Sequence, residues 1–168
     1  MKILITGAYG MLGSDLQETL KNHELIITGS KDLDITSKDK VIQFIKEKKP
    51  EIVINAAAYT AVDNCESNYD YAYEVNALGP TNLAIACNIN NIPLIHISTD
   101  YVFDGNKKTP LNEEDKLGPK TIYGKTKLEG EKFIQKNTKK FFILRTALAI
   151  WDSWKKFCTN YVKFIKEK

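Results

Sequence analysis

The sequence has few cysteines, no long apolar run and no excess of one charge, and each absence excludes a class of protein. Cys65, Cys87 and Cys158 are odd in number, widely spaced and without a C-x-x-C pair, so neither a disulfide framework nor a zinc site is expected. No apolar stretch approaches the roughly 20 residues of a membrane span, and the first residues lack the pattern of a signal peptide. We therefore expect a cytoplasmic protein without membrane contact.

The balance of charge and apolar residues indicates one soluble domain. The net charge of +3 is spread over 168 residues, although lysines become more frequent after Lys116, so no nucleic-acid partner is expected. Hydrophobic residues make up 43% of the chain and charged residues 27%, which is enough apolar material for a sizeable core.

Short apolar runs alternate with helical patterns along the chain. The runs predict strands at residues 3–5, 25–28, 52–55, 94–98 and 141–144. Helices are predicted after the first strand and over residues 36–48, 69–90 and 121–137, the third being broken at Gly79-Pro80. Continuously apolar strands that alternate with helices predict an α/β fold with a doubly wound parallel sheet and helices on both faces, which is the Rossmann-type nucleotide-binding architecture. The polar loop over residues 100–120 is long enough to cover a site.

A glycine-rich turn joins the first strand to the first helix. Residues 7–13 read Gly-Ala-Tyr-Gly-Met-Leu-Gly, and a nucleotide pyrophosphate can rest on such a helix N-terminus because its N–H groups lack partners. The alternative is a tight turn that binds nothing. The turn residues predicted to contact the nucleotide are Gly7, Tyr9, Gly10, Met11, Leu12 and Gly13.

The ends of the second and third strands supply further candidate contacts. Ala56, Ala57 and Ala58 are small enough for a flat ligand to lie against the backbone. The second strand ends without the acidic residue that usually binds the ribose of NAD, and Lys31 tolerates a 2′-phosphate. The sequence thus favours NADPH as cofactor, with NADH as the alternative because acidic residues follow soon after.

Tyr123 and Lys127 are four residues apart on a predicted helix and share one side of it. A lysine ammonium beside the phenol is expected to lower the tyrosine pKa from about 10 toward neutrality, so that Tyr123 can act as a proton donor. Thr99 and Ser98 both end the fourth strand, and adjacent strand residues face opposite ways, so only one of them is expected to reach the substrate.

Three longer stretches extend these motifs. Residues 60–63 read Thr-Ala-Val-Asp, residues 98–105 read Ser-Thr-Asp-Tyr-Val-Phe-Asp-Gly, and residues 124–131 read Gly-Lys-Thr-Lys-Leu-Glu-Gly-Glu. With the glycine turn and the Tyr-Lys pair, they resemble the extended short-chain dehydrogenase/reductases and, within them, the dTDP-4-dehydrorhamnose reductase family. The resemblance covers residues 1 to about 146.

The resemblance implies an oxidoreductase that reduces a dTDP-4-keto-6-deoxy sugar with NADPH or NADH in dTDP-rhamnose biosynthesis. It implies that Thr99, Tyr123 and Lys127 are catalytic, which decides between Thr99 and Ser98, and that Tyr123 and Lys127 also contact the cofactor. The further residues it implies are Asp34 and Ile35 at the adenine, Asn76 in support of the cofactor site, and Asp100 and Tyr101, with Thr99, at the dTDP-sugar substrate.

The chain departs from that family near its end. After Arg145-Thr146 the position of a family tryptophan holds Leu148. We expect an NAD(P)-binding domain over residues 1–146, a divergent loop and amphipathic helix over 147–168, and no C-terminal substrate domain. The apolar face of residues 157–168 is expected to contact a second copy or another partner. The alternatives are a non-catalytic nucleotide-binding or regulatory relative, and a reductase or epimerase of another nucleotide sugar.

Overall fold

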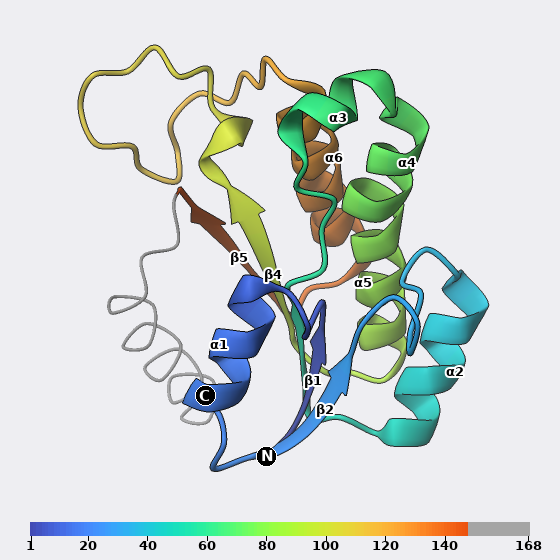
Figure 1. Cartoon of the computed structure of the whole chain (residues 1–168). Coiled ribbons are helices and arrows are strands. Elements are labelled where there is room, and N and C mark those ends of the chain that lie inside the picture. The colour runs from blue at the N-terminus through green and yellow to red at the C-terminus, as the bar shows by residue number, and fades with distance from the viewer. Residues whose placement is uncertain (148–168) are drawn as a thin grey trace.

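The structure is a computed structural model that describes residues 1–147. Within these residues the centre is a five-stranded sheet of order β2-β1-β3-β4-β5 in which every strand pair is parallel (Figure 1). The strands are β1 (Lys2–Thr6), β2 (Glu24–Thr28), β3 (Ile52–Asn55), β4 (Leu94–Thr99) and β5 (Phe141–Thr146). All five lie where the apolar runs predicted them, and the doubly wound fold is confirmed.

Apolar side chains cover both faces of the sheet because alternate strand residues point in opposite directions. On one face, α1 (Met11–Thr19) packs Leu16 against Ile3 and Ile5 of β1. On the other, Leu4 lies in a cluster with residues of α2 (Lys38–Lys48), α5 (Gly79–Ile89) and α6 (Ile122–Asn137). Figure 1 shows α1 on one side of the sheet and these three helices on the other.

The helix predicted over residues 69–90 is not broken at Gly79-Pro80. It consists of α4 (Tyr69–Tyr73), a π-helical turn η1 (Glu74–Leu78) and α5, and Gly79 keeps helical angles of φ −55° and ψ −55°. Pro80 has no N–H to donate, and its ring would crowd the carbonyl four residues earlier, that of Asn76. The wider π turn accommodates the proline. The short helix α3 (Val62–Ser67) was not predicted.

The loop over residues 100–120 is tied to the fold near its two ends. It begins with the 3-10 turn η2 (Asp100–Val102), and Phe103 forms an antiparallel bridge with Leu117. The Gly118 N–H also donates to the Val102 carbonyl at 3.0 Å. The residues between these attachments therefore lie beside the carboxyl end of β4 (Figure 1).

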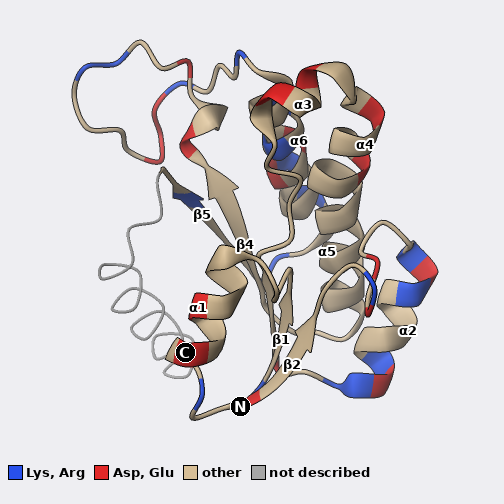
Figure 2. Cartoon of the chain, viewed as in Figure 1, with Lys and Arg blue, Asp and Glu red and all other residues tan. Residues whose placement is uncertain are grey.

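The surface of the described part carries both signs of charge. Figure 2 shows Lys and Asp or Glu residues mixed along α2, whereas acidic residues mark α3 and α4. None of the helices within residues 1–147 has the length and apolar character to cross a membrane. Cys65 and Cys87 are buried free thiols. Cys158, Leu148 and the helix predicted over 157–168 lie outside the described residues.

Candidate functional site

The carboxyl ends of β1, β2 and β3 are level, since Thr6 pairs with Thr28 on one side and with Asn55 on the other. The connection after β1 leads to β2 on one side of it, and the connection after β2 crosses back to β3 on the other side. The gap between β1 and β3 is therefore the topological switch point, where such sheets bind ligands. Gly7 and Ala56 follow directly at this gap.

Gly7 makes the close approach of these two strand ends possible. Its φ is +69°, and a Cβ at this position would lie 2.5 Å from the Ala57 nitrogen. Gly10 caps the N-terminus of α1, and the nearest atom to a Cβ there is the Gly7 carbonyl oxygen at 3.3 Å. The first-turn N–H groups of α1 have no carbonyl partner within the helix. Gly7 is therefore required by packing, whereas a Cβ at Gly10 would meet a single close neighbour.

A cavity of about 580 Å³ extends from this turn along the ends of β1, β2 and β3. Eight of the residues predicted from sequence line it, namely Gly7, Tyr9, Gly10, Asp34, Ile35, Ala56, Ala57 and Ala58. Prediction missed Gly29, Ser30, Leu33, Thr36, Tyr59, Tyr71, Glu74 and Val75. Only Tyr59 carried a usable signal, because it directly follows the alanine triplet. The predicted cofactor contacts that are not among the lining residues are Met11, Leu12, Gly13, Lys31, Asn76, Tyr123 and Lys127.

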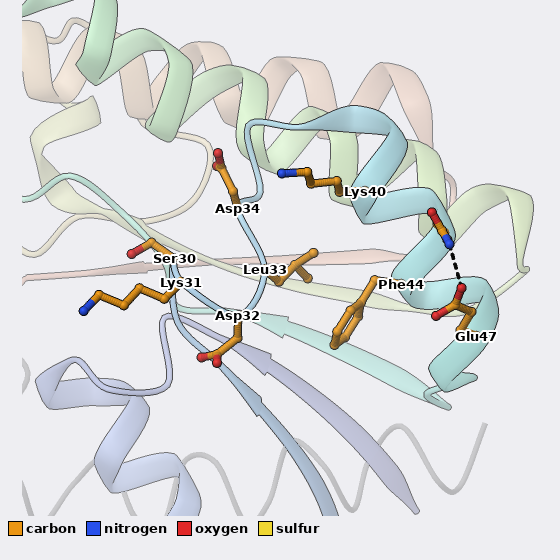
Figure 3. A pocket seen from close by; sticks show the side chains of 9 residues that line it. Ser30, Lys31, Asp32, Leu33, Asp34, Lys40, Phe44 and Glu47 are labelled. Carbon is orange, nitrogen blue, oxygen red and sulfur yellow. Dashed lines mark hydrogen bonds between the residues drawn. The ribbon is translucent and has the colours of Figure 1, made fainter.

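The segment after β2 carries both a cation and a carboxylate. Lys31 lies on a smaller hollow of about 270 Å³ that shares Ser30, Leu33 and Asp34 with the large cavity. The Asp32 carboxylate turns back to accept the Gly29 N–H at 2.9 Å, and its charge raises the pKa of Tyr9. Figure 3 shows Lys31 and Asp32 pointing in different directions, with Lys40 extending from α2 toward Asp34. An acidic group thus stands at the end of β2 although none follows the strand directly in sequence.

Ser98 and Thr99 face opposite sides of β4, as adjacent strand residues must. The Ser98 hydroxyl donates to Oε1 of the buried Glu131 at 2.5 Å, and Arg145 donates to the same carboxylate. Thr99 Oγ1 accepts the Tyr101 N–H at 3.2 Å. Ser98 is therefore committed to the packing of α6, and Thr99 is the hydroxyl that faces Tyr123.

Tyr123 lies in the first turn of α6 beside Thr99 and Tyr101. Its ring meets the Tyr101 ring edge-on at a centroid distance of 5.5 Å. Burial raises the pKa of Tyr123, a hydrogen bond with Thr99 lowers it by less, and the nearby Cys65 and Asp100 raise it further. The expectation that the pKa of Tyr123 is lowered beside Lys127 is wrong for this structure, because burial of the phenol dominates and raises it.

Lys127 is buried, and its amine is directed at β4. Nζ donates to the Ile97 carbonyl at 2.6 Å and lies 3.3 Å from Nε2 of His96. Burial lowers the pKa of Lys127 to about 8, and the Glu131 carboxylate opposes that shift. The helical spacing predicts Lys127 and Tyr123 on one side of the helix, but it does not predict that the amine of Lys127 contacts the backbone of β4.

Asn76 lies in the π turn and is 0% exposed. Its Oδ1 accepts the Tyr59 N–H at 2.8 Å, and its Nδ2 donates to the Tyr59 carbonyl and to Thr126 Oγ1. The whole amide is thus used to hold the chain after β3 against α6. In this arrangement Asn76 positions the wall of the large cavity.

A third hollow of about 260 Å³ lies beside η2. Two of the residues expected at a substrate, Asp100 and Tyr101, line it together with Phe103, Asp104, Gly105, Lys120 and Thr121. The Asp100 carboxylate accepts the Thr99 hydroxyl at 3.2 Å. The hollow therefore adjoins the Thr99 and Tyr123 side chains.

A parallel sheet with a glycine turn and a long cavity at its switch point defines a doubly wound nucleotide-binding domain of the Rossmann type. Within this class, the family model described as RmlD substrate binding domain matches residues 1–168. The chain belongs to this family.

Individual relatives agree with this assignment. The dTDP-4-dehydrorhamnose reductase of Aggregatibacter actinomycetemcomitans is 39% identical over 170 residues, which cover 99% of this chain and 58% of that protein. The crystal structure of a dTDP-4-dehydrorhamnose reductase from Clostridium acetobutylicum is 53% identical with a TM-score of 0.87, and the match covers 90% of this chain and 55% of that one. The Bacillus anthracis enzyme in complex with NADP is 41% identical with a TM-score of 0.84, and the match covers 87% of this chain and 53% of that one. This chain thus spans somewhat more than half the length of these relatives.

Proposed function

We propose that this chain provides the cofactor-binding and proton-donating part of an oxidoreductase that converts dTDP-4-dehydrorhamnose to dTDP-rhamnose with NAD(P)H, a step of nucleotide-sugar and cell-surface polysaccharide synthesis. The observation that carries the proposal is that Tyr123 stands beside Tyr101 and Thr99 at the carboxyl end of β4, on the same edge of the sheet where the glycine turn lines the large cavity. In this proposal residues 1–146 are the NAD(P)-binding domain and residues 147–168 lead out of it.

The residues present fit a dinucleotide. Gly10 lines the cavity at the N-terminus of α1 and leaves room for a pyrophosphate there, where N–H groups and the helix dipole favour negative charge. Asp34 and Ile35 line the far end of the same cavity, where the adenosine would lie. Lys31 favours the 2′-phosphate of NADPH, and Asp32 leaves NADH as an alternative. That NADP is bound by the related Bacillus anthracis enzyme supports this assignment.

When bound, the reduced nicotinamide supplies a hydride to the carbonyl carbon of the sugar. Tyr123 then donates its phenolic proton to the carbonyl oxygen, and Thr99 donates a hydrogen bond to the same oxygen. The raised pKa of Tyr123 keeps the phenol protonated before the reaction, which suits a proton donor in the direction of reduction. Asp100 and Tyr101 line the adjoining hollow and would hold the sugar.

The remaining parts of the proposal concern partners and location. We place the protein in the cytoplasm, with a dTDP-sugar as its ligand and neither nucleic acid nor membrane as a partner. The apolar spacing in the sequence of residues 157–168 favours contact with a second copy or another protein. Measurement of the mass in solution tests this contact, and a strictly monomeric mass contradicts it.

Calorimetric titration of the 168-residue chain with NADPH and NADH is the first test, and binding of at least one is expected. Gly10→Val should abolish it, because Gly10 lines the cavity at the N-terminus of α1 and a valine side chain would take the space in which the pyrophosphate would lie. Absence of binding by the unaltered chain refutes the cofactor assignment.

The second test follows NADPH oxidation with dTDP-4-dehydrorhamnose. Tyr123→Phe should lower the rate by at least about 100-fold and leave NADPH affinity nearly unchanged, since it removes a proton donor but little binding surface. Cofactor binding without turnover identifies a non-catalytic nucleotide-binding relative. Turnover of a different nucleotide sugar alone overturns the substrate assignment.

A further inference from the structure

The carboxylate of Asp32 lies beside the position that an acidic residue usually holds in this type of fold. That residue binds the ribose 2′-hydroxyl from the end of the second strand, and here the residue directly after β2 is Gly29. A Cβ at Gly29 would lie 3.7 Å from Oδ2 of Asp32, which is about the reach of a glutamate side chain. Asp32 therefore brings its charge to within the reach of an acidic residue at position 29.

The turn after β2 fixes where this carboxylate lies. Oδ2 of Asp32 accepts the Gly29 N–H at 2.9 Å. The backbone closes the same turn, because the N–H groups of Asp32 and Leu33 donate to the Gly29 carbonyl at 3.1 and 2.9 Å. Gly29 and Leu33 line the large cavity. The carboxylate is thus held beside the cavity by its own main chain.

Tyr9 closes the turn from the side of the glycine turn. Its ring lies so near Gly29 that a Cβ there would come within 2.6 Å of Cδ2 and 2.9 Å of Cε2. The Ala8 N–H donates to the Thr28 carbonyl at 3.0 Å, which joins the two turns through their backbones. The charge of Asp32 raises the pKa of Tyr9, so the phenol stays protonated beside the carboxylate and can donate to it.

We propose that Asp32 determines the preference between NADH and NADPH by opposing a 2′-phosphate, and that Tyr9 is the positioning residue that keeps the carboxylate against Gly29. A carboxylate can accept the 2′-hydroxyl of NADH, but it repels the anionic 2′-phosphate of NADPH. The inference rests on the proposed function, because it concerns the cofactor assigned there.

The neighbouring lysines do not cancel this charge. Lys31 and Lys40 line the smaller hollow together with Asp32. Figure 3 shows Lys31 and Asp32 pointing in different directions, and Lys40 extending toward Asp34. Both ammonium groups are therefore directed away from the Asp32 carboxylate, and its negative charge acts on the region beside Gly29.

Calorimetric titration of the 168-residue chain with NADPH and NADH measures the preference as the ratio of the two affinities. Asp32→Asn keeps an acceptor for the Gly29 N–H and removes the charge, so the ratio should move toward NADPH by at least about tenfold at low salt and by less at high salt. The NADH affinity should change little, because an amide oxygen still accepts a 2′-hydroxyl. An unchanged ratio overturns the proposal.

Glu47→Gln is the matched control, since it also removes one carboxylate from the smaller hollow. Glu47 lies on α2, where it accepts from Nε2 of Gln43 at 2.8 Å, and Figure 3 shows it on the other side of the hollow from Asp32. We expect the affinity ratio to change by less than about threefold. Equal changes in the two variants would mean that the net charge of the hollow sets the preference, which refutes the role of Asp32.

Tyr9→Phe tests the positioning role. Loss of the hydroxyl should move the ratio toward NADPH by about 2–5-fold, and the same change should add nothing in Asp32→Asn. Carbon NMR of the tyrosine rings gives the pKa of Tyr9, assigned by its absence in Tyr9→Phe, and this pKa should fall toward its ordinary 10.0 in Asp32→Asn. Additive effects of the two substitutions, or a Tyr9 pKa that Asp32→Asn leaves unchanged, refute the role of Tyr9.

These outcomes separate the inference from the proposed function. If the unaltered chain binds neither nucleotide, the cofactor assignment is refuted and the inference falls with it. If it binds both and Asp32→Asn leaves the ratio unaltered, only the role of Asp32 is refuted. Should Asp32→Asn fail to fold, Tyr9→Phe still decides, because it keeps the ring over Gly29, and an unchanged ratio in that variant overturns the proposal.

Discussion

Gly7→Ala should destabilise the protein through two separable effects. The first is the left-handed backbone of residue 7, φ +69°, which costs a residue with a Cβ roughly 1–2 kcal/mol. The second is collision, because the new Cβ would lie 2.5 Å from the Ala57 nitrogen and 2.7 Å from the Ala56 carbonyl carbon. These atoms belong to the backbone after β3 and cannot rotate away, so we add about 1–3 kcal/mol for overpacking. The total expected loss is about 2–5 kcal/mol.

Gly105→Ala is the control that isolates the collision. Its φ is +72°, nearly the same as that of Gly7, but a Cβ there has no atom within 4 Å. We expect a loss of about 1–2 kcal/mol, the backbone cost alone. Both variants are compared with the unaltered chain by urea unfolding followed by circular dichroism, at constant m-value. Equal losses for the two glycines would show that the close approach of β1 and β3 does not require Gly7.

Three further perturbations address the buried polar groups. Arg145→Met should reduce the free energy of unfolding by about 3–5 kcal/mol, because it leaves the buried Glu131 carboxylate without its ion-pair partner. A loss below about 1 kcal/mol in urea unfolding contradicts this reasoning. The double variant with Glu131→Gln should recover part of the lost stability. Between pH 8 and 10.5 the unfolded chain binds a proton that the folded Lys127 has released, so stability should rise with pH, by up to about 3 kcal/mol. Lys127→Met should flatten that rise. The comparison is the difference in unfolding free energy between the variant and the unaltered chain at each pH. Subtraction is needed because burial raises the pKa of Cys87 to about 12, which makes stability fall with pH above pH 9 in both proteins. Asn76→Ala should cost about 3 kcal/mol by leaving the partly buried N–H and carbonyl of Tyr59 without their partner, and thermal unfolding that is unchanged would refute this role.

The fold was predictable because its signals are local. Ile3, Leu4 and Ile5 are apolar in succession, as a strand covered on both faces must be, and the glycine turn marks where the chain leaves it. The π turn was not predictable, since it depends on how Pro80 and the Asn76 carbonyl fit together in three dimensions. The proline was interpreted as a break because its missing N–H gives the same sequence signal in either case.

The candidate site was predictable only in part. Residues next to a strand end, such as Gly10 and Ala57, were placed correctly on the cavity because the sheet fixes where its strand ends lie. Tyr71 reaches the same cavity from α4, and its place depends on the packing of separate elements. The charge state of Lys127 depends on which atoms surround its amine, and His96, 31 residues away in sequence, carries no pattern that announces this contact.

The order of the strands also determines how the chain must assemble. β1 is the first strand to be synthesised, yet it pairs with β2 on one edge and β3 on the other. Its second edge stays open until residues such as Asn55, 49 positions after Thr6, have left the ribosome, which takes about 2–10 s at ordinary rates of translation. Because every strand pair within residues 1–147 is parallel and distant in sequence, so that no hairpin joins neighbours there, refolding should be slow for this length. During that interval one edge of the apolar β1 is unpaired and open to association with other chains.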